Sequence, residues 1–222
     1  MKRIIIVITS LISLIANVSA NSKEWRELTT YKDIKIYAKD ENTEGIIPFK
    51  AIYTVDINQE LLVMSLFNYN LKPTWAPKLK SVKIHREISP TQFIFSEYYT
   101  TPWPFYDREF LLEGKVYSDG NTVWLKANSI KSEDLHDQDH VQANVEIIEV
   151  AITKIGKNKT LLSFEFVGDM GGMIPTWVIN IIQKKWPAKF LLGLEKFSLS
   201  EDNQPSAEYL NWRKDVNLNS RN

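Results

Sequence analysis

Apolar and polar residues alternate along most of this chain, in short segments separated by turn residues. In the clearest segment, residues 33–39, the apolar residues Ile34, Ile36 and Ala38 all fall on one face. Alternation with a period of two is typical of strands that bury one side. The same pattern predicts strands over residues 46–55, 82–88, 91–100, 109–117, 122–130, 141–155 and 160–167. Because the connections between them are short, we expect one curved antiparallel sheet.

Three other segments have apolar residues at helical spacing. A short helix is predicted over residues 23–28, and a second helix follows Asp56 or Asn58 and ends at Pro73. The third begins at Ile174 and continues to residue 199, although Pro187 should kink or split it. One face of this helix contains Ile174, Trp177, Val178, Ile181, Ile182 and Lys185, and Phe190, Leu191, Leu194 and Phe197 continue it. These elements predict an α+β fold in which the curved antiparallel sheet wraps around the long C-terminal helix.

Residues 1–20 have the composition of a secretory signal peptide. Lys2 and Arg3 precede an apolar run over residues 4–16, and Val18-Ser19-Ala20 supplies the small residues of a cleavage site. We expect cleavage after Ala20 and a periplasmic or secreted protein. An uncleaved anchor is the alternative, although the run is short for a membrane span. The rest of the chain then forms one domain over residues 21–199 and a loose polar tail over residues 200–222.

Composition limits the classes of function. The 222 residues are 44% hydrophobic, with 27 basic and 27 acidic side chains and no cysteine. A chain of this length can bury a core without disulfides. The balanced charge argues against a nucleic-acid partner, and the lack of cysteine excludes thiol catalysis.

Several short segments occur in an order that resembles one known family. They are Trp25, Phe49-Lys50-Ala51, Trp75-Ala76-Pro77, Pro102-Trp103-Pro104 with Asp107-Arg108-Glu109, Gly171-Gly172-Met173-Ile174-Pro175-Thr176-Trp177, and Pro187-Ala188-Lys189-Phe190-Leu191. Together they resemble the START family of lipid-binding domains, from about residue 25 to residue 197. The resemblance implies the helix-grip fold, with a hydrophobic tunnel between the sheet and the last helix. It also implies a mobile lid made by the loop around Trp103 and Phe105 with that helix.

Members of the START family bind sterols, phospholipids, ceramide or other apolar molecules. Sterol-binding members carry a carboxylate and an arginine on adjacent strands of the cavity. Glu97 matches the carboxylate, but Gly114 stands where the arginine belongs, and Gln142 replaces another arginine. The resemblance therefore implies an apolar ligand that is held differently from a sterol.

Candidate ligand-binding residues come from the sheet, the lid and the last helix. Glu97 is in phase with Phe93, Phe95 and Tyr99, and a carboxylate on an apolar face needs a partner, such as a polar group of the ligand. The exposed apolar loop around Trp103 suits contact with a membrane, although Trp103 folding back on the core is an equal alternative. The full candidate set is Phe95, Glu97, Tyr99, Trp103, Phe105, Arg108, Met173, Trp177, Val178 and Ile181.

Other groups of polar residues have structural explanations. Asp107-Arg108-Glu109 is interpreted as a salt bridge at the base of the loop rather than a catalytic group. His136 and His140 lie among acids, which permits a metal site, but a solvated loop is favoured. No nucleophile elbow or phosphate loop occurs.

The sequence therefore favours a monomeric, noncatalytic lipid carrier that uses no cofactor and contacts membranes transiently. The main alternative is an enzyme of the helix-grip superfamily, a cyclase or hydrolase that uses Glu97 or Asp107-Arg108 inside the cavity. A third possibility is a ligand-sensing interaction module.

Overall fold

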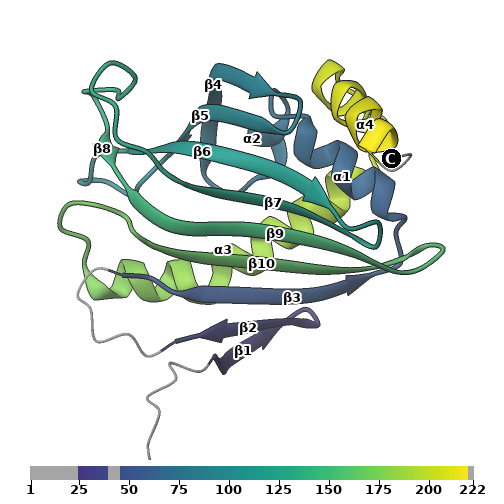
Figure 1. The fold of residues 1–222 in the computed structure, drawn as a ribbon. Helices are drawn as coiled ribbons and strands as arrows, with labels where there is room; N and C mark the ends of the chain where they lie inside the picture. The colour runs from purple at the N-terminus through teal and green to yellow at the C-terminus, as the bar shows by residue number, and fades with distance from the viewer. Residues whose placement is uncertain (1–24, 40–45, 220–222) are drawn as a thin grey trace, which may run out of the picture.

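Ten strands form one twisted sheet in the computed structural model, which describes residues 25–39 and 46–219. The strand order is β1-β2-β3-β10-β9-β7-β6-β5-β4, with antiparallel neighbours, and the short β8 pairs with β6 in parallel (Figure 1). The strands are β1 (Arg26–Tyr31), β2 (Ile34–Ala38), β3 (Phe49–Val55), β4 (Leu79–Ser89), β5 (Gln92–Tyr99), β6 (Arg108–Ser118), β7 (Thr122–Ser129), β8 (Val141–Gln142), β9 (Asn144–Gly156) and β10 (Lys159–Asp169).

The helices gather on one side of this sheet. They are α1 (Gln59–Phe67), α2 (Lys72–Trp75), α3 (Thr176–Ser198) and α4 (Ala207–Asn219). The long α3 runs across the sheet, and its far end reaches α1 (Figure 1). This arrangement confirms the predicted α+β fold, in which a curved antiparallel sheet wraps around the long C-terminal helix. None of the described helices is long and apolar enough to cross a membrane.

The predicted helix boundaries are partly wrong at two prolines. Asn58 caps α1 as expected, because its side chain accepts a hydrogen bond from the backbone N–H of Glu60 at 2.8 Å. However, α1 ends at Phe67, and Pro73 lies in the first turn of α2, where its missing N–H costs nothing. Pro187 lies inside α3 without splitting it. Packing of this buried part of α3 on the sheet offsets the lost hydrogen bond.

Two segments differ from the prediction because of tertiary contacts. Residues 26–28 belong to strand β1 rather than to a helix, since Arg26 and Glu27 pair with Ala38 and Tyr37 of β2. Residues 207–219 form α4 rather than part of a loose tail. Tyr209 and Trp212 are three residues apart on this helix, so both reach the same neighbour. They are buried against Phe67 of α1, with ring centroids 6.0 and 5.2 Å away.

The expected signal peptide, including Lys2, Arg3 and Ala20, lies outside the described residues. Cleavage and export therefore stay predictions.

Candidate functional site

Two chambers lie between the sheet and α3. The outer chamber, near the start of α3, has a volume of about 360 Å³ and is lined by apolar residues of α3 such as Ile174, Val178 and Ile182. The inner chamber, of about 80 Å³, lies under β4–β7 and reaches α1 and α4; Phe95 is part of its wall. Small-molecule pockets usually measure about 300–1,000 Å³, so the outer chamber alone falls within that range.

Tyr99 and Trp186 separate the chambers, because both residues line both. Their ring centroids are 5.8 Å apart. The indole N–H of Trp186 donates to the backbone carbonyl of Pro77 at 3.0 Å, and the indole also packs on Phe164 and Phe190 at 5.3 and 6.0 Å. These contacts fix the indole between α3, the sheet and the turn before β4. A long ligand that fills both chambers would therefore contact both rings.

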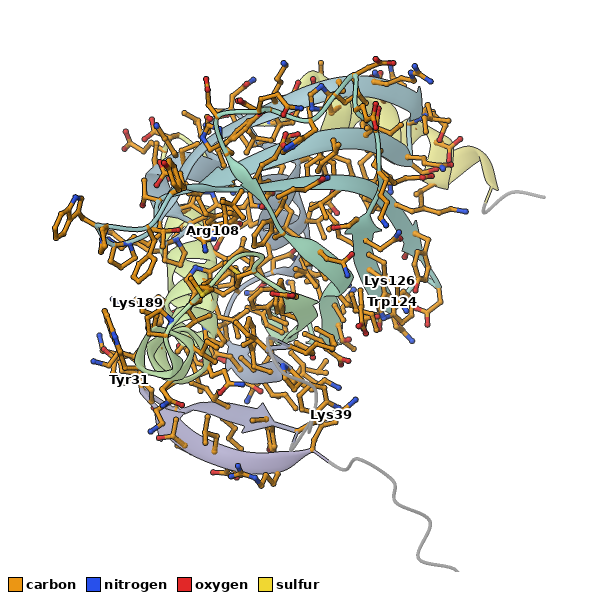
Figure 2. All side chains as sticks on the ribbon, turned by 90° about the vertical axis from the view of Figure 1, so that its left-hand side faces the viewer. Tyr31, Lys39, Arg108, Trp124, Lys126 and Lys189 are labelled. Atoms are coloured by element: carbon orange, nitrogen blue, oxygen red, sulfur yellow. The ribbon has the colours of Figure 1, made fainter. Side chains whose placement is uncertain are left out.

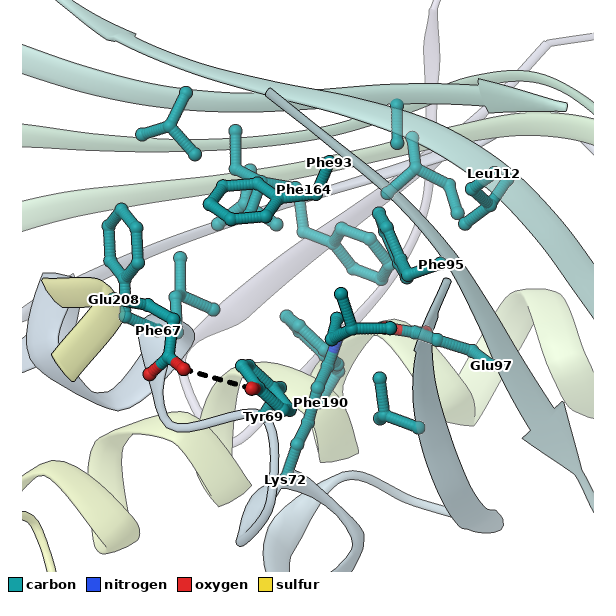
Figure 3. Close-up of a pocket in the computed structure, with 18 of the residues that line it drawn as sticks. Phe67, Tyr69, Lys72, Phe93, Phe95, Glu97, Leu112, Phe164, Phe190 and Glu208 are labelled. Carbon is teal, nitrogen blue, oxygen red and sulfur yellow. Dashed lines mark hydrogen bonds and ion pairs between the residues drawn. The ribbon is translucent and has the colours of Figure 1, made fainter. Parts of the chain in front are cut away.

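An ion pair lies in the wall of the inner chamber (Figure 3). The ammonium group of Lys72 on α2 pairs with the Glu97 carboxylate on β5, and the Tyr99 hydroxyl donates to the same carboxylate at 2.6 Å. The side chains of Glu97 and Lys72 are only 5% and 15% exposed. Burial, and secondarily the negative Glu97, raise the pKa of Tyr99 well above its ordinary value, so this hydroxyl keeps its proton. The arrangement leaves Lys72 with donors available for a polar group of a ligand.

Lys72 supplies a cation to Glu97 from a different element than sterol-binding START domains use. An added Cβ at Gly114 on β6 would lie 2.8 Å from the ring of Phe95, so any side chain at this position would require Phe95 to move. Sequence reasoning missed Lys72 because it is a polar residue next to Pro73, at the predicted end of a helix, where no apolar pattern places its side chain. A lone buried acid in the predicted strand was the only signal that a cation was needed.

The far end of the inner chamber is bounded by Tyr69 and Glu208. The hydroxyl of Tyr69 donates to the Glu208 carboxylate at 2.9 Å (Figure 3). Burial, followed by the hydrogen bond to Glu208, raises the pKa of Tyr69. Since Glu208 belongs to α4, the segment that was expected to be a loose tail contributes to the cavity wall.

Arg108 joins the two loops beside the outer chamber. Its guanidinium donates to the carbonyls of Tyr106 in the lid loop (residues 100–107) and of Met170 and Gly171 in the loop before α3; the latter two distances are 3.2 and 3.0 Å. Burial lowers the pKa of Arg108 below its ordinary value. Gly171 has a φ of 71°, and a Cβ there would lie 2.5 Å from the Gln142 carbonyl oxygen, so this turn requires glycine. Arg108 lines neither chamber, and its observed contacts are structural.

Large apolar side chains project from these two loops and the start of α3. Trp103 and Met173 are each 92% exposed, Tyr106 is 75% exposed and Trp177 is 56% exposed. Trp103 therefore does not fold back on the core. Phe105 is half-buried in the lid loop and lines neither chamber.

A second polar network lies on the other face of β5, since Ser96 alternates with Phe95 and Glu97. The Glu109 carboxylate is fully buried and accepts hydrogen bonds from Ser96 at 2.7 Å, Tyr98 at 3.3 Å and the backbone N–H of Asp137 at 2.9 Å. His136 also contacts it at 2.5 Å. This network attaches the polar loop before β8 to the sheet.

The acid–base segment 107–109 is not one salt bridge, because each residue has different partners. Asp107 accepts from the backbone N–H of Thr101 at 3.0 Å and lies 3.6 Å from Lys80. No group of three or more His, Asp or Glu residues within the described ranges is placed to hold a metal ion.

The structure brings together only part of the predicted ligand set. Phe95 and Glu97 line the inner chamber, Trp177 and Val178 the outer chamber, and Tyr99 both. Trp103, Phe105, Arg108 and Met173 lie in or beside the lid and line neither chamber. The side chain of Ile181 lies outside the described part of the chain.

Several solved structures have the same fold as this chain. Human STARD10 superposes with a TM-score of 0.72 at 15% identity, covering 88% of this chain and 78% of its own. Human StAR-related lipid transfer protein 5 has a TM-score of 0.70 at 16% identity and covers 81% and 88%. A STAR-related lipid transfer protein fragment from Xanthomonas axonopodis has a TM-score of 0.68 at 14% identity and covers 79% and 99%.

At these identities the solved structures establish the fold alone. No curated protein matched the sequence. The family model of the START domain matches residues 6–198, which is most of the chain. The chain therefore belongs to the START domain family.

Proposed function

We propose that this protein binds one lipid or similar apolar molecule between the sheet and α3 and carries it without chemical change. Family membership supports lipid binding in general, and the similar structures include proteins named for lipid transfer. The observation that carries the proposal is the outer chamber, a largely apolar space of about 360 Å³ beside a loop with exposed aromatic residues.

The energetic requirement of transfer explains this architecture. Moving an acyl chain from a bilayer into water costs about 0.8 kcal/mol per methylene, or on the order of 12 kcal/mol for about fifteen methylenes. An apolar wall such as that formed by Val178, Ile182 and Phe166 offsets this cost. Entry then requires movement of the lid loop and the start of α3, which Arg108 connects through three carbonyls.

The exposed side chains beside the chamber support a transient membrane contact. Trp103 and Tyr106 have the amphipathic rings that favour the membrane interface, and Met173 adds a flexible apolar group. In this proposal these side chains contact the membrane during loading, with the chamber opening turned toward the bilayer. With export after cleavage at Ala20, we propose a periplasmic or secreted carrier, which we also expect to be a monomer.

The alternative function, a cyclase or hydrolase, has less support. Glu97 is paired with Lys72 and Tyr99, whereas the segment 107–109 has only structural contacts. A carboxylate held in this way suits binding a polar group better than attack or proton transfer.

Mass spectrometry of the purified protein tests the proposal. We expect one apolar molecule per chain under native conditions, identified after extraction. Val178→Trp inserts a bulky side chain into the outer chamber and should strongly reduce this occupancy, whereas Ile155→Trp, at an exposed site outside both chambers, should retain it. Circular dichroism of both variants verifies folding. A chain that is empty and shows turnover lost in Glu97→Gln would replace the carrier proposal with the enzyme.

A further inference from the structure

Three lysines line the outer chamber: Lys78 in the turn before β4, and Lys185 and Lys189 on α3. All three are exposed, and no Asp or Glu of the described residues lines this chamber. The inner chamber differs, because its lysine is paired with a carboxylate. Since the whole chain has equal numbers of basic and acidic residues, this local excess of positive charge is not a consequence of composition.

None of these three lysines has an ion-pair partner within 4.0 Å among the described residues. Other lysines of the sheet do, such as Lys50 with Glu165 at 2.6 Å and Lys126 with Glu149 at 2.7 Å. Unpaired like charges around one opening repel each other, and their combined field attracts an anion.

The fold holds the three lysines around the same chamber. Lys185 and Lys189 are four residues apart on α3 and so lie on the same face, separated by about 6 Å along the helix axis. Between them, Trp186 donates its indole N–H to the carbonyl of Pro77, the residue before Lys78. The carbonyl of Lys78 in turn accepts the backbone N–H of Thr100 at 2.9 Å, which connects the turn to the lid loop. Figure 2 views the end of the molecule that carries this loop and labels Lys189 below Arg108.

We infer that the ligand is an amphiphile with an anionic headgroup, a phosphate or a carboxylate, bound by Lys78, Lys185 and Lys189 while its chain occupies the outer chamber. The inference rests on the proposed function and specifies its ligand class. Lysine stems pack along apolar walls while the ammonium groups stay in water, so the headgroup need not be fully desolvated. A choline-type cation would find no carboxylate in this lining.

The test compares two probes that differ only in the charged group. Palmitoyl lysophosphatidic acid and monopalmitoylglycerol have the same chain and glycerol, and each competes with the neutral dye Nile red in the full chain below micelle formation. We expect the phosphate to improve competition at least about tenfold at low salt, with each lysine contributing about two- to fivefold. The advantage should shrink as salt is added.

A triple Lys78→Gln, Lys185→Gln, Lys189→Gln variant should lose this advantage and retain its affinity for monopalmitoylglycerol. Lys184→Gln is the matched control, since Lys184 is an exposed neighbour on α3 that lines neither chamber. Inorganic phosphate alone should not displace the dye; if it does, the lysines form a simple anion site and the inference is wrong.

Vesicles distinguish a bound headgroup from a membrane surface. The variant is compared with the natural chain on phosphatidylcholine vesicles with and without phosphatidylglycerol. If the variant loses only vesicle binding and keeps its preference for lysophosphatidic acid, the lysines contact the membrane and the inference fails. If neither amphiphile competes and the natural chain holds no apolar molecule, the carrier proposal itself fails. Equal competition by both probes overturns only the assignment of an anionic headgroup.

Discussion

Neutralising Lys72 tests whether the ion pair in the inner chamber depends on both of its charges. Lys72→Met removes the cation and keeps an unbranched side chain, which leaves Glu97 buried with only the Tyr99 hydroxyl as a partner. Lys72→Met with Glu97→Gln removes both charges, while the Gln oxygen still accepts the hydrogen bond from Tyr99. The comparison therefore separates the cost of a lone buried charge from the value of the pair.

The expected magnitude follows from burial. With the Glu97 side chain only 5% exposed, removing its partner should lower the free energy of unfolding by about 3 kcal/mol at neutral pH. The double variant should lie within about 1 kcal/mol of the natural protein, because desolvating two charges roughly cancels their attraction. Disrupting the more exposed Lys126–Glu149 pair by Lys126→Met serves as the control and should cost about 1 kcal/mol or less.

Urea unfolding followed by circular dichroism measures these differences, with each preparation stripped of bound lipid. Measuring Glu97→Gln alone completes the double-mutant cycle, which gives the coupling energy between positions 72 and 97. If Lys72→Met and the double variant are equally destabilised, Glu97 does not depend on Lys72, and the pairing described above is wrong.

Three further predictions follow from particular contacts. Trp212→Ala should lower the free energy of unfolding by about 3–5 kcal/mol and speed hydrogen exchange of the α4 amides, whereas Leu210→Ala on the exposed side should do neither. Equal effects of the two variants would mean that α4 is not anchored by its buried face. Gly193→Ala should lower the free energy of unfolding, measured in urea, by about 3 kcal/mol, because its Cβ would lie 2.3 Å from the carbonyl oxygen of Trp75. An unchanged unfolding midpoint would show that α2 and α3 move apart at little cost. Burial, followed by the charge of Lys83, lowers the pKa of His85 below 6.5, so its contribution to stability is complete above pH 6.5 and is lost as the pH falls through its folded pKa; an NMR titration of His85 at or above 6.5 would contradict this.

The sequence periodicity predicted which side chains of β5 and of the last helix share a face. Glu97 was predicted to share a face with Phe93, Phe95 and Tyr99, and all four side chains line the inner chamber. A strand has a side-chain period of two whatever it packs against, so this phase depends only on local sequence. One face of the last helix was predicted in the same way, and its residues Ile174, Trp177, Val178, Ile182 and Lys185 line the outer chamber.

The hydrogen-bond and ion-pair partners of polar side chains that lie far apart in the sequence could not be predicted. The role of Arg108 depends on carbonyls of residues 170 and 171, more than sixty positions away, and Lys72 meets Glu97 across 25 positions. A carbonyl exists at every residue, so composition does not reveal which one a guanidinium will reach.

The sequence by itself determined most of the strands, one face of the long last helix and the resemblance to the family, because these depend on local periodicity and short motifs. The tertiary structure decided that residues 26–31 form a strand and residues 207–219 a helix, since their stability comes from β2 and α1 rather than from local preference. It also decided that Tyr99 and Trp186 separate two chambers and that three unpaired lysines surround the outer one. These groups come from separate elements, and only the curvature of the sheet around α3 brings them together.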